Sequence, residues 1–235
     1  MIIPSLAEIN WAEAYRIVRS SYGVVDPFED IADPEDWSLL HSAEMKTDPQ
    51  LMESVGNADL LPASRKVEGA GSDFLMYPFA HLSLDRPTRF SDGRYGVLYA
   101  GDSFEVALME TVRHHERFMA ATQERSGWTS AFRTFTLTVS GALHDARPML
   151  ESAWFATDSY DAAHALAEPL LASGSYGIVY SSLRFPGGSC AALFYPDLAS
   201  NPVEGRQLHF HWNGRHVDYV RDAESGIVSR VNSAG

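Results

Sequence analysis

The sequence predicts an α+β fold built on a curved, mostly antiparallel β-sheet. Residues 134–139 alternate threonine with apolar side chains, which is the pattern of a strand with one buried face. Asn213-Gly214 lies between two apolar segments and is the strongest short signal for a β-hairpin. The predicted helices do not alternate regularly with the strands, so a doubly wound parallel sheet is not expected.

The expected strands follow the apolar segments of the chain. Phe135, Leu137 and Val139 lie on one face of the alternating segment, so we expect them in the core. The segments expected as strands are residues 15–18, 74–80, 95–100, 134–139, 143–146, 176–182, 190–195, 207–212 and 215–220. The polar tail after Asp222 is expected to fray.

Capping residues and prolines mark the helix starts. Asp33-Pro34 and Asp48-Pro49 each place an Asp before a Pro at the first helical position. Together they predict a helical insertion over about residues 33–56. The two further helices that we expect run from Ser103 to before Gly127 and from Asp158 or Ser159 to near Gly174.

Composition narrows the class of protein. A chain of 235 residues with 45 % hydrophobic side chains suits one domain, which we take as residues 1–235. The formal net charge of −13 disfavours direct binding to nucleic acid. The start of the chain does not have the pattern of a signal peptide, and no apolar run approaches the ~20 residues of a membrane helix. We therefore expect a cytoplasmic protein that does not bind membranes.

The chemistry-bearing residues give few compact motifs. The sequence has neither a Gly-x-Gly-x-x-Gly fingerprint nor a phosphate-binding Gly-x-x-x-x-Gly-Lys loop. Cys190 is the single cysteine, which excludes an intrachain disulfide and fits a reducing compartment. No neighbouring residue in the sequence would favour its thiolate, so we expect a buried structural thiol. Glu116 and Glu124 lie in a charged part of the predicted helix and are expected to face solvent.

Histidines offer a metal-site hypothesis. Glu110 and His114 are four apart on a predicted helix, and His209 and His211 are two apart on a predicted strand. Each pair shares a face and could offer ligands to zinc or iron. No compact signature such as His-Glu-x-x-His supports that hypothesis, and the ordinary interpretation places His114 and His115 in solvent. A metal-dependent β-rich enzyme and a non-catalytic binding module are the alternative functions, and our leading site contains no metal.

Glu110 has an unusual setting for a carboxylate. It lies within an apolar helical segment, so it is either at the edge of the apolar stripe or held for chemistry. An ordinary role would be an ion pair with Arg94 or Arg113. Tyr99 ends an apolar segment, and its ordinary role would be packing with a bonded hydroxyl. Arg89 precedes a Gly-containing turn, where an arginine ordinarily faces solvent.

Several separated segments together resemble the RES domain, a family of bacterial toxins named after an Arg, a Glu and a Ser. The central match is Arg89-Phe90-Ser91-Asp92-Gly93-Arg94-Tyr95-Gly96-Val97-Leu98-Tyr99-Ala100, followed by Ala107-Leu108-Met109-Glu110-Thr111. The other matching segments are residues 15–18, 33–37 and 177–184 and the strand over residues 190–195, so the resemblance runs from about residue 10 to 215.

The resemblance implies a fold related to ADP-ribosyltransferases, in which a split sheet holds NAD in a crevice. It implies a toxin that consumes NAD as a substrate by cleaving the nicotinamide–ribose bond. ADP-ribose would pass to a protein target, to water or to phosphate, and the sequence does not select among these acceptors. It also implies a cognate antitoxin with an Xre-like DNA-binding part that blocks the active site. The oligomeric state is left open.

Residue by residue, the resemblance assigns the family glutamate to Glu110 and the active-site tyrosine to Tyr99. The family serine falls on Ser182, with Ser181 beside it as the alternative. The family arginine is either Arg89, by its spacing to the two central residues, or Arg16 in the first strand. These are the catalytic and cofactor-binding residues that we expect.

The proposed chemistry needs these residue types. Nicotinamide leaves as a neutral base, so no general acid is required, unlike ordinary glycoside hydrolysis with its two carboxylates. The Glu110 carboxylate would stabilise positive charge on the ribose. Tyr99 would stack on the nicotinamide or wall the ribose, and Ser182 would hydrogen-bond to either group. Arg89 or Arg16 would clamp the pyrophosphate through paired hydrogen bonds.

Overall fold

The structure is a computed structural model that describes residues 2–20, 60–84, 87–122, 124–157 and 159–231. The strands are β1 (Leu6–Arg19), β2 (Leu98–Gly101), β3 (Trp128–Asp145), β4 (Gly177–Ser181), β5 (Ser189–Leu193), β6 (Ala199–Trp212), β7 (Val217–Asp222) and β8 (Val228–Arg230). The α-helices are α3 (Ser72–Ala80), α4 (Phe104–Thr122) and α5 (Asp161–Ala172). The helical insertion predicted over about residues 33–56 lies outside the described residues.

All the strands belong to one 8-stranded sheet in the order β1-β2-β5-β4-β3-β6-β7-β8, and β1 also pairs with β3. Every pairing is antiparallel except β3 with β4, which is parallel. The predicted α+β class with a mostly antiparallel sheet is therefore confirmed. In the part of the chain that the structure describes, no helix is both long enough and apolar enough to cross a membrane.

The sheet consists of two halves with short junctions. One half contains the long strands β1, β3 and β6 with β7 and β8, and the other contains the short strands β2, β5 and β4. At one junction Tyr15 of β1 faces Gly101 of β2. At the other, His144 and Asp145 at the end of β3 pair with β4. The sheet is thus split, as the resemblance implied, and β2 and β4 border the split.

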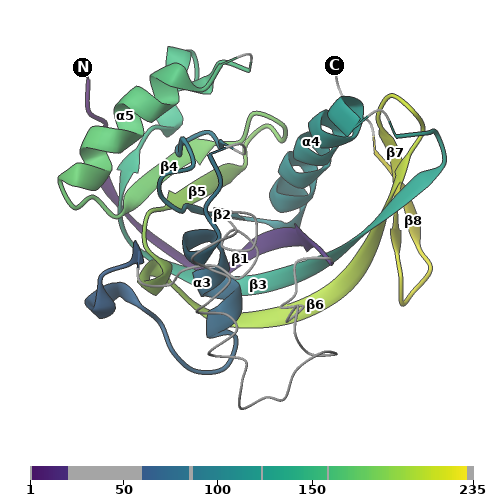
Figure 1. The fold of residues 1–235 in the computed structure, drawn as a ribbon, viewed down its shortest axis with the longest axis horizontal. Helices are drawn as coiled ribbons and strands as arrows, with labels where there is room; N and C mark the ends of the chain where they lie inside the picture. Colours follow the sequence, from purple (N-terminus) through teal and green to yellow (C-terminus); the bar gives the residue numbers. More distant parts are fainter. Residues whose placement is uncertain (1, 21–59, 85–86, 123, 158, 232–235) are drawn as a thin grey trace, which may run out of the picture.

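Each α-helix packs against a different part of this split sheet. Helix α4 lies in the concavity of the long strands (Figure 1), where its Ala107, Val112 and Met119 join a core with strands β3, β6 and β7. Helix α5 packs its alanines and leucines against the short strands. Helix α3 contributes Leu75 and Phe79 to the core between the two halves. The described helices and strands therefore form three apolar clusters, one with each helix.

Local patterns account for most elements. Phe135, Leu137 and Val139 are buried on β3, as predicted. The segment 143–146 is the end of this same strand rather than a separate one. In the β6–β7 hairpin, Asn213 accepts hydrogen bonds at its side-chain oxygen from the backbone N–H groups of the two residues after Gly214. Gly214 has a φ of 96°, a conformation that glycine adopts at low cost.

Two further predictions of secondary structure are wrong. Residues 74–80, expected as a strand, belong to α3, because Leu75 and Phe79 are four apart and are buried on one helical face. Pro78 lies inside this helix, where it has no N–H to donate to the carbonyl of residue 74. Within the described part of the tail after Asp222, Val228–Arg230 form β8 instead of fraying, because β8 pairs with β7 through main-chain hydrogen bonds that need no apolar side chains.

Candidate active site

A hydrogen-bonded carboxylate on α4 is the centre of the site. Oε1 of Glu110 accepts a hydrogen bond of 2.7 Å from the Ser182 hydroxyl and one of 3.2 Å from the Leu183 backbone N–H. Oε2 accepts none from the residues that the structure describes. Glu110 is half-buried. The protein thus fixes the carboxylate through one oxygen and leaves the other available to a ligand.

The turn after β4 determines the direction of the Ser182 hydroxyl. The Ser182 oxygen accepts hydrogen bonds from the backbone N–H groups of Arg184 and Phe185, at 3.1 and 3.0 Å. Its own proton is therefore donated to Glu110. Gly188 closes this turn against α4, where a Cβ atom would collide with the Val106 side chain. The close approach of the turn to α4 brings the serine and the glutamate together.

Ser181 points elsewhere. Its hydroxyl donates a hydrogen bond of 3.3 Å to the backbone oxygen of Arg147. Successive residues of an extended chain point to opposite sides, so only one of the two serines can contact α4. Of the two serines left open by the sequence, Ser182 is the one that contacts Glu110.

Tyr99 fastens the turn that carries Arg89. Its hydroxyl donates a hydrogen bond of 3.0 Å to the Thr88 side chain and accepts one of 2.9 Å from the Phe90 backbone N–H. Burial raises the pKa of Tyr99 to about 12, so the phenol is neutral near pH 7. The backbone oxygen of Thr88 also accepts a hydrogen bond of 2.8 Å from His164 on α5. The hydroxyl of Tyr99 is therefore occupied, and its ring is the part that could contact a substrate.

The two candidate arginines lie at opposite ends of Tyr99. Arg16 donates a hydrogen bond of 2.9 Å to the Tyr99 backbone oxygen, next to the β1–β2 junction. Arg89 lies at the hydroxyl end, where its Nη1 donates hydrogen bonds of 3.0 and 3.1 Å to the backbone oxygens of Trp154 and Ala156. Arg16 thus joins two strands across the split, whereas Arg89 joins a turn to the segment that leads into α5.

Tyr180 connects these residues electrostatically. Burial raises the pKa of its phenol well above the usual value, and the charge of Glu110 and the Tyr99 phenol raise it further, whereas Arg89 lowers it. Three of the predicted site residues therefore act electrostatically on one buried phenol on β4. Tyr180 is not among the residues predicted from the sequence, although it lies in the matching segment 177–184. Burial also raises the pKa of the adjacent Cys190 thiol, which is buried as predicted.

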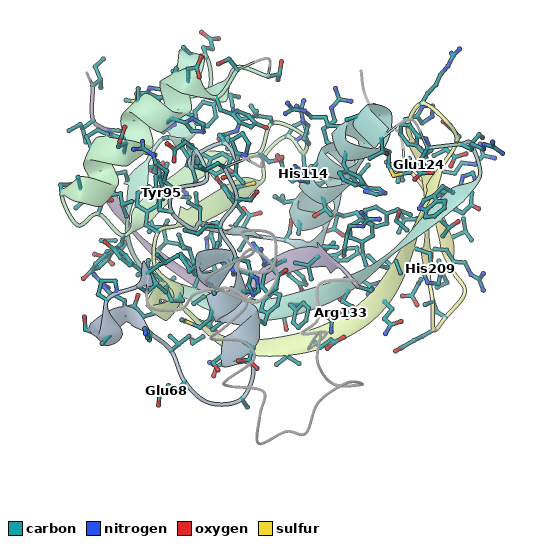
Figure 2. All side chains as sticks on the ribbon, viewed as in Figure 1. Glu68, Tyr95, His114, Glu124, Arg133 and His209 are labelled. Atoms are coloured by element: carbon teal, nitrogen blue, oxygen red, sulfur yellow. The ribbon has the colours of Figure 1, made fainter. Side chains whose placement is uncertain are left out.

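The four candidate metal ligands do not gather. His114 is exposed on α4, whereas His209 lies on β6 in another part of the molecule (Figure 2). Nδ1 of His211 lies 2.6 Å from Oδ1 of Asp218 and its ring stacks on Tyr219. Within the described ranges, no three His, Cys, Asp or Glu side chains are close enough to hold a metal ion.

Two polar residues on α4 differ from the sequence prediction. Glu116 and His115, expected in solvent, are buried with exposed fractions of 4 % and 3 %. The helix lies in the concave sheet, so a second face of α4 is covered that its local charge pattern did not reveal. Arg113 pairs with Glu116, and Arg94 pairs with Asp92 and Glu168. Neither arginine pairs with Glu110.

A search of curated proteins returned no match. Among solved structures, the M. tuberculosis MbcT-MbcA toxin-antitoxin complex contains a similar chain, with 11 % identity, a TM-score of 0.45 and coverage of 86 % of this chain and 87 % of that chain. The family model described as the RES domain matches residues 65–213, a range that contains Arg89, Tyr99, Glu110 and Ser182. Because this match spans more than half of the sequence, the chain belongs to the RES domain family.

Proposed function

We propose that this protein is the toxin of a bacterial toxin-antitoxin pair and that it consumes NAD by cleaving the nicotinamide–ribose bond. The observation that carries the proposal is the Glu110 carboxylate, held at one oxygen by Ser182 and by the Leu183 backbone N–H. Its other oxygen has no hydrogen-bond partner among the described residues. Membership of the RES domain family supports the assignment.

The proposed reaction needs one anion and no acid. As the bond from ribose C1′ to the nicotinamide nitrogen breaks, both bonding electrons go to nicotinamide, which leaves as a neutral base. Positive charge develops on the ribose, and a fixed carboxylate lowers the free energy of that transition state. A lone pair on the acceptor oxygen then forms the new bond to C1′, and the acceptor loses its proton. Glu110 supplies the anion without rearrangement because Ser182 already orients it.

The other residues would position the substrate. The Tyr99 ring would stack on the nicotinamide or wall the ribose, since its hydroxyl is already bonded to the Arg89 turn. Arg16 and Arg89 are both cofactor-binding candidates. The geometry favours Arg89 for the phosphates, because its Nε and Nη2 donors have no partner among the described residues. Arg16 would instead hold the Tyr99 backbone at the split.

Nicotinamide release from NAD tests the proposal. The purified chain would be incubated with NAD in water alone, with inorganic phosphate, and with cell extract, so that free ADP-ribose, ADP-ribose phosphate and modified protein identify the acceptor. Glu110→Gln should abolish release, whereas Glu105→Gln should retain it because Glu105 is exposed on the first turn of the same helix. Absence of nicotinamide release from the wild type under all three conditions would contradict the proposal and favour a non-catalytic binding module.

The antitoxin part of the proposal has its own test. A small protein with an Xre-like DNA-binding part, encoded next to this chain, should form a complex with it and stop nicotinamide release. In bacteria, expression of the wild type in the cytoplasm should deplete NAD and arrest growth, and co-expression of the small protein should restore growth. Growth arrest that persists in Glu110→Gln would contradict toxicity through NAD.

A further inference from the structure

Two arginines pack on one tyrosine beside the candidate active site. The guanidinium carbon of Arg89 lies 5.2 Å from the ring centroid of Tyr160, and that of Arg117 lies 5.4 Å from the same centroid. Nη1 of Arg117 also donates a hydrogen bond of 2.6 Å to the Tyr160 hydroxyl. The arginines come from a loop and from α4, and the tyrosine immediately precedes α5. Three distant segments of the chain thus bring two cations to one ring.

Neither cation is neutralised within the part of the chain that the structure describes. Arg89 donates to two backbone oxygens and Arg117 to a phenol, and neither forms an ion pair with a described carboxylate. Several other arginines, including Arg65, Arg94 and Arg147, do pair with carboxylates. In a chain of net charge −13, two cations that share one ring and lack such partners form a local site for an anion.

The position of Arg117 relative to Glu110 suits a dinucleotide. The two residues are seven apart on α4, so they lie on the same face, about 10 Å apart along the helix axis. Thr88 and Phe90, on either side of Arg89, bond to the Tyr99 hydroxyl, so the paired arginines adjoin the site around that tyrosine. A ribose at Glu110 would therefore be followed along α4 by a cationic surface, in the order in which ribose and diphosphate occur in NAD.

We propose that Arg117 and Arg89, held on the Tyr160 ring, form the subsite that binds the diphosphate of the dinucleotide. This inference rests on the proposed function, because it assigns a further part of the same substrate to the same site. A planar guanidinium can donate two parallel hydrogen bonds to one phosphate. The Nε and Nη2 donors of both arginines have no described partner, so each arginine can bind one phosphate group of a diphosphate.

Binding of phosphate-containing probes tests the subsite without relying on turnover. The probes are ADP, inorganic pyrophosphate and nicotinamide, which lacks phosphate, and binding is measured by calorimetry. The variants are Arg117→Gln, Arg117→Lys and Tyr160→Phe, and the control is Arg125→Gln, which removes the same charge at an exposed position after α4. KM and kcat for nicotinamide release are measured in parallel, and thermal unfolding checks that each variant is folded.

We expect Arg117→Gln to weaken binding of ADP and pyrophosphate by about 10- to 100-fold, because charged hydrogen bonds to phosphate are lost. Nicotinamide binding should be unchanged. KM for NAD should rise by a similar factor while kcat changes little, since Arg117 is distant from the bond that breaks. Arg117→Lys should lose less affinity because it keeps the charge. Tyr160→Phe should bind ADP and pyrophosphate several-fold more weakly, because the ring remains but the hydroxyl that bonds to Arg117 is absent.

The outcomes separate the subsite from the reaction. If Arg117→Gln binds ADP and pyrophosphate as tightly as Arg125→Gln does, or if the wild type binds neither probe, the subsite is wrong even when nicotinamide is released. If the wild type binds ADP through Arg117 but releases no nicotinamide, the subsite is supported and the proposed reaction is wrong. A fall in kcat with unchanged KM and unchanged ADP affinity would also overturn the subsite.

Discussion

Glu110 and Glu116 are two carboxylates on one helix with different surroundings. Glu116 is 4 % exposed, and both its oxygens are engaged, one by the Val217 backbone N–H at 2.9 Å and the other by Arg113 at 3.3 Å. Glu110 is half-buried and has one oxygen engaged by Ser182 and Leu183. Glu116 joins α4 to β7, whereas Glu110 faces the turn after β4 across the split.

Burial alone therefore does not identify the carboxylate that we propose for the reaction. The more deeply buried Glu116 has its hydrogen-bonding capacity used by the fold, which is the usual condition of a buried polar group. Glu110 is oriented by the fold but retains an oxygen that described residues do not use. A partly satisfied carboxylate with a fixed orientation is the arrangement that can respond to charge on a substrate.

The largest expected effect is on activity at Glu110. Glu110→Gln should lower kcat for nicotinamide release by about 100-fold or more, because the amide carries no negative charge toward the developing cation. The free energy of unfolding should change by less than about 1 kcal/mol, since the amide oxygen can still accept the Ser182 and Leu183 hydrogen bonds. Initial rates and denaturant unfolding measure the two quantities. Loss of stability without loss of rate would mean that Glu110, like Glu116, serves the fold rather than the reaction.

Glu116 should show the opposite behaviour. Glu116→Ala should lower the free energy of unfolding by about 2–3 kcal/mol, because the buried Val217 N–H loses its acceptor. Well below the melting temperature, kcat should stay within about two-fold of the wild type. Thermal unfolding and nicotinamide release measure this pair of quantities. A rate that falls as far as in Glu110→Gln, in protein that is still folded, would place Glu116 in the chemistry and contradict the distinction.

The serine pair should show a smaller effect. Ser182→Ala should lower kcat/KM by about 10-fold, since one hydrogen bond to a charged carboxylate is lost while that from the Leu183 N–H remains. Ser181→Ala is the matched control and should stay near the wild type, because its hydroxyl bonds to the backbone of Arg147 instead. Steady-state kinetics compares the variants. Equal losses in the two would mean that the turn, rather than the hydroxyl, orients Glu110.

The pH dependence of stability tests the burial of the His115 imidazole on α4. Burial among aromatic rings, with the nearby charges of Arg19 and His114, lowers the pKa of His115 from 6.5 to about 4. Between these values the unfolded chain binds more protons, so stability should fall as pH falls through that window. His115→Leu should show a shallower fall in denaturant unfolding across the window. Parallel pH profiles for the two proteins would contradict the depressed pKa.

Much of the secondary structure followed from local pattern. The alternation in β3 and the Asn213-Gly214 turn predicted their elements correctly, because strand and turn conformations are set by neighbouring residues. The segment 74–80 was misassigned because an aromatic, apolar run suits both a buried strand and a buried helix. β8 was missed because an edge strand can form through main-chain pairing with a neighbour that local sequence does not reveal.

The sequence likewise predicted some of the candidate site residues but not all of them. The spacing of Arg89, Tyr99 and Glu110 and the match to the RES domain pointed to them before any contact was known. Tyr180 and Arg117 were not selected, because neither a buried tyrosine nor a helical arginine is unusual in sequence alone. Their relevance depends on neighbours that lie tens of residues away, such as Tyr160 for Arg117.

By itself, the sequence determined the fold class, strand β3, the β6–β7 hairpin, and the candidate residues Glu110 and Tyr99. The fold class and these elements depend on local periodicity and turn motifs, whereas the two candidate residues depend on the resemblance to the RES domain. Only the tertiary structure decided which serine contacts Glu110 and how the two carboxylates of α4 differ. It also placed Arg16 and Arg89 at opposite ends of Tyr99. The physical reason is that hydrogen-bond partners and burial arise from packing between distant segments, which local sequence does not specify.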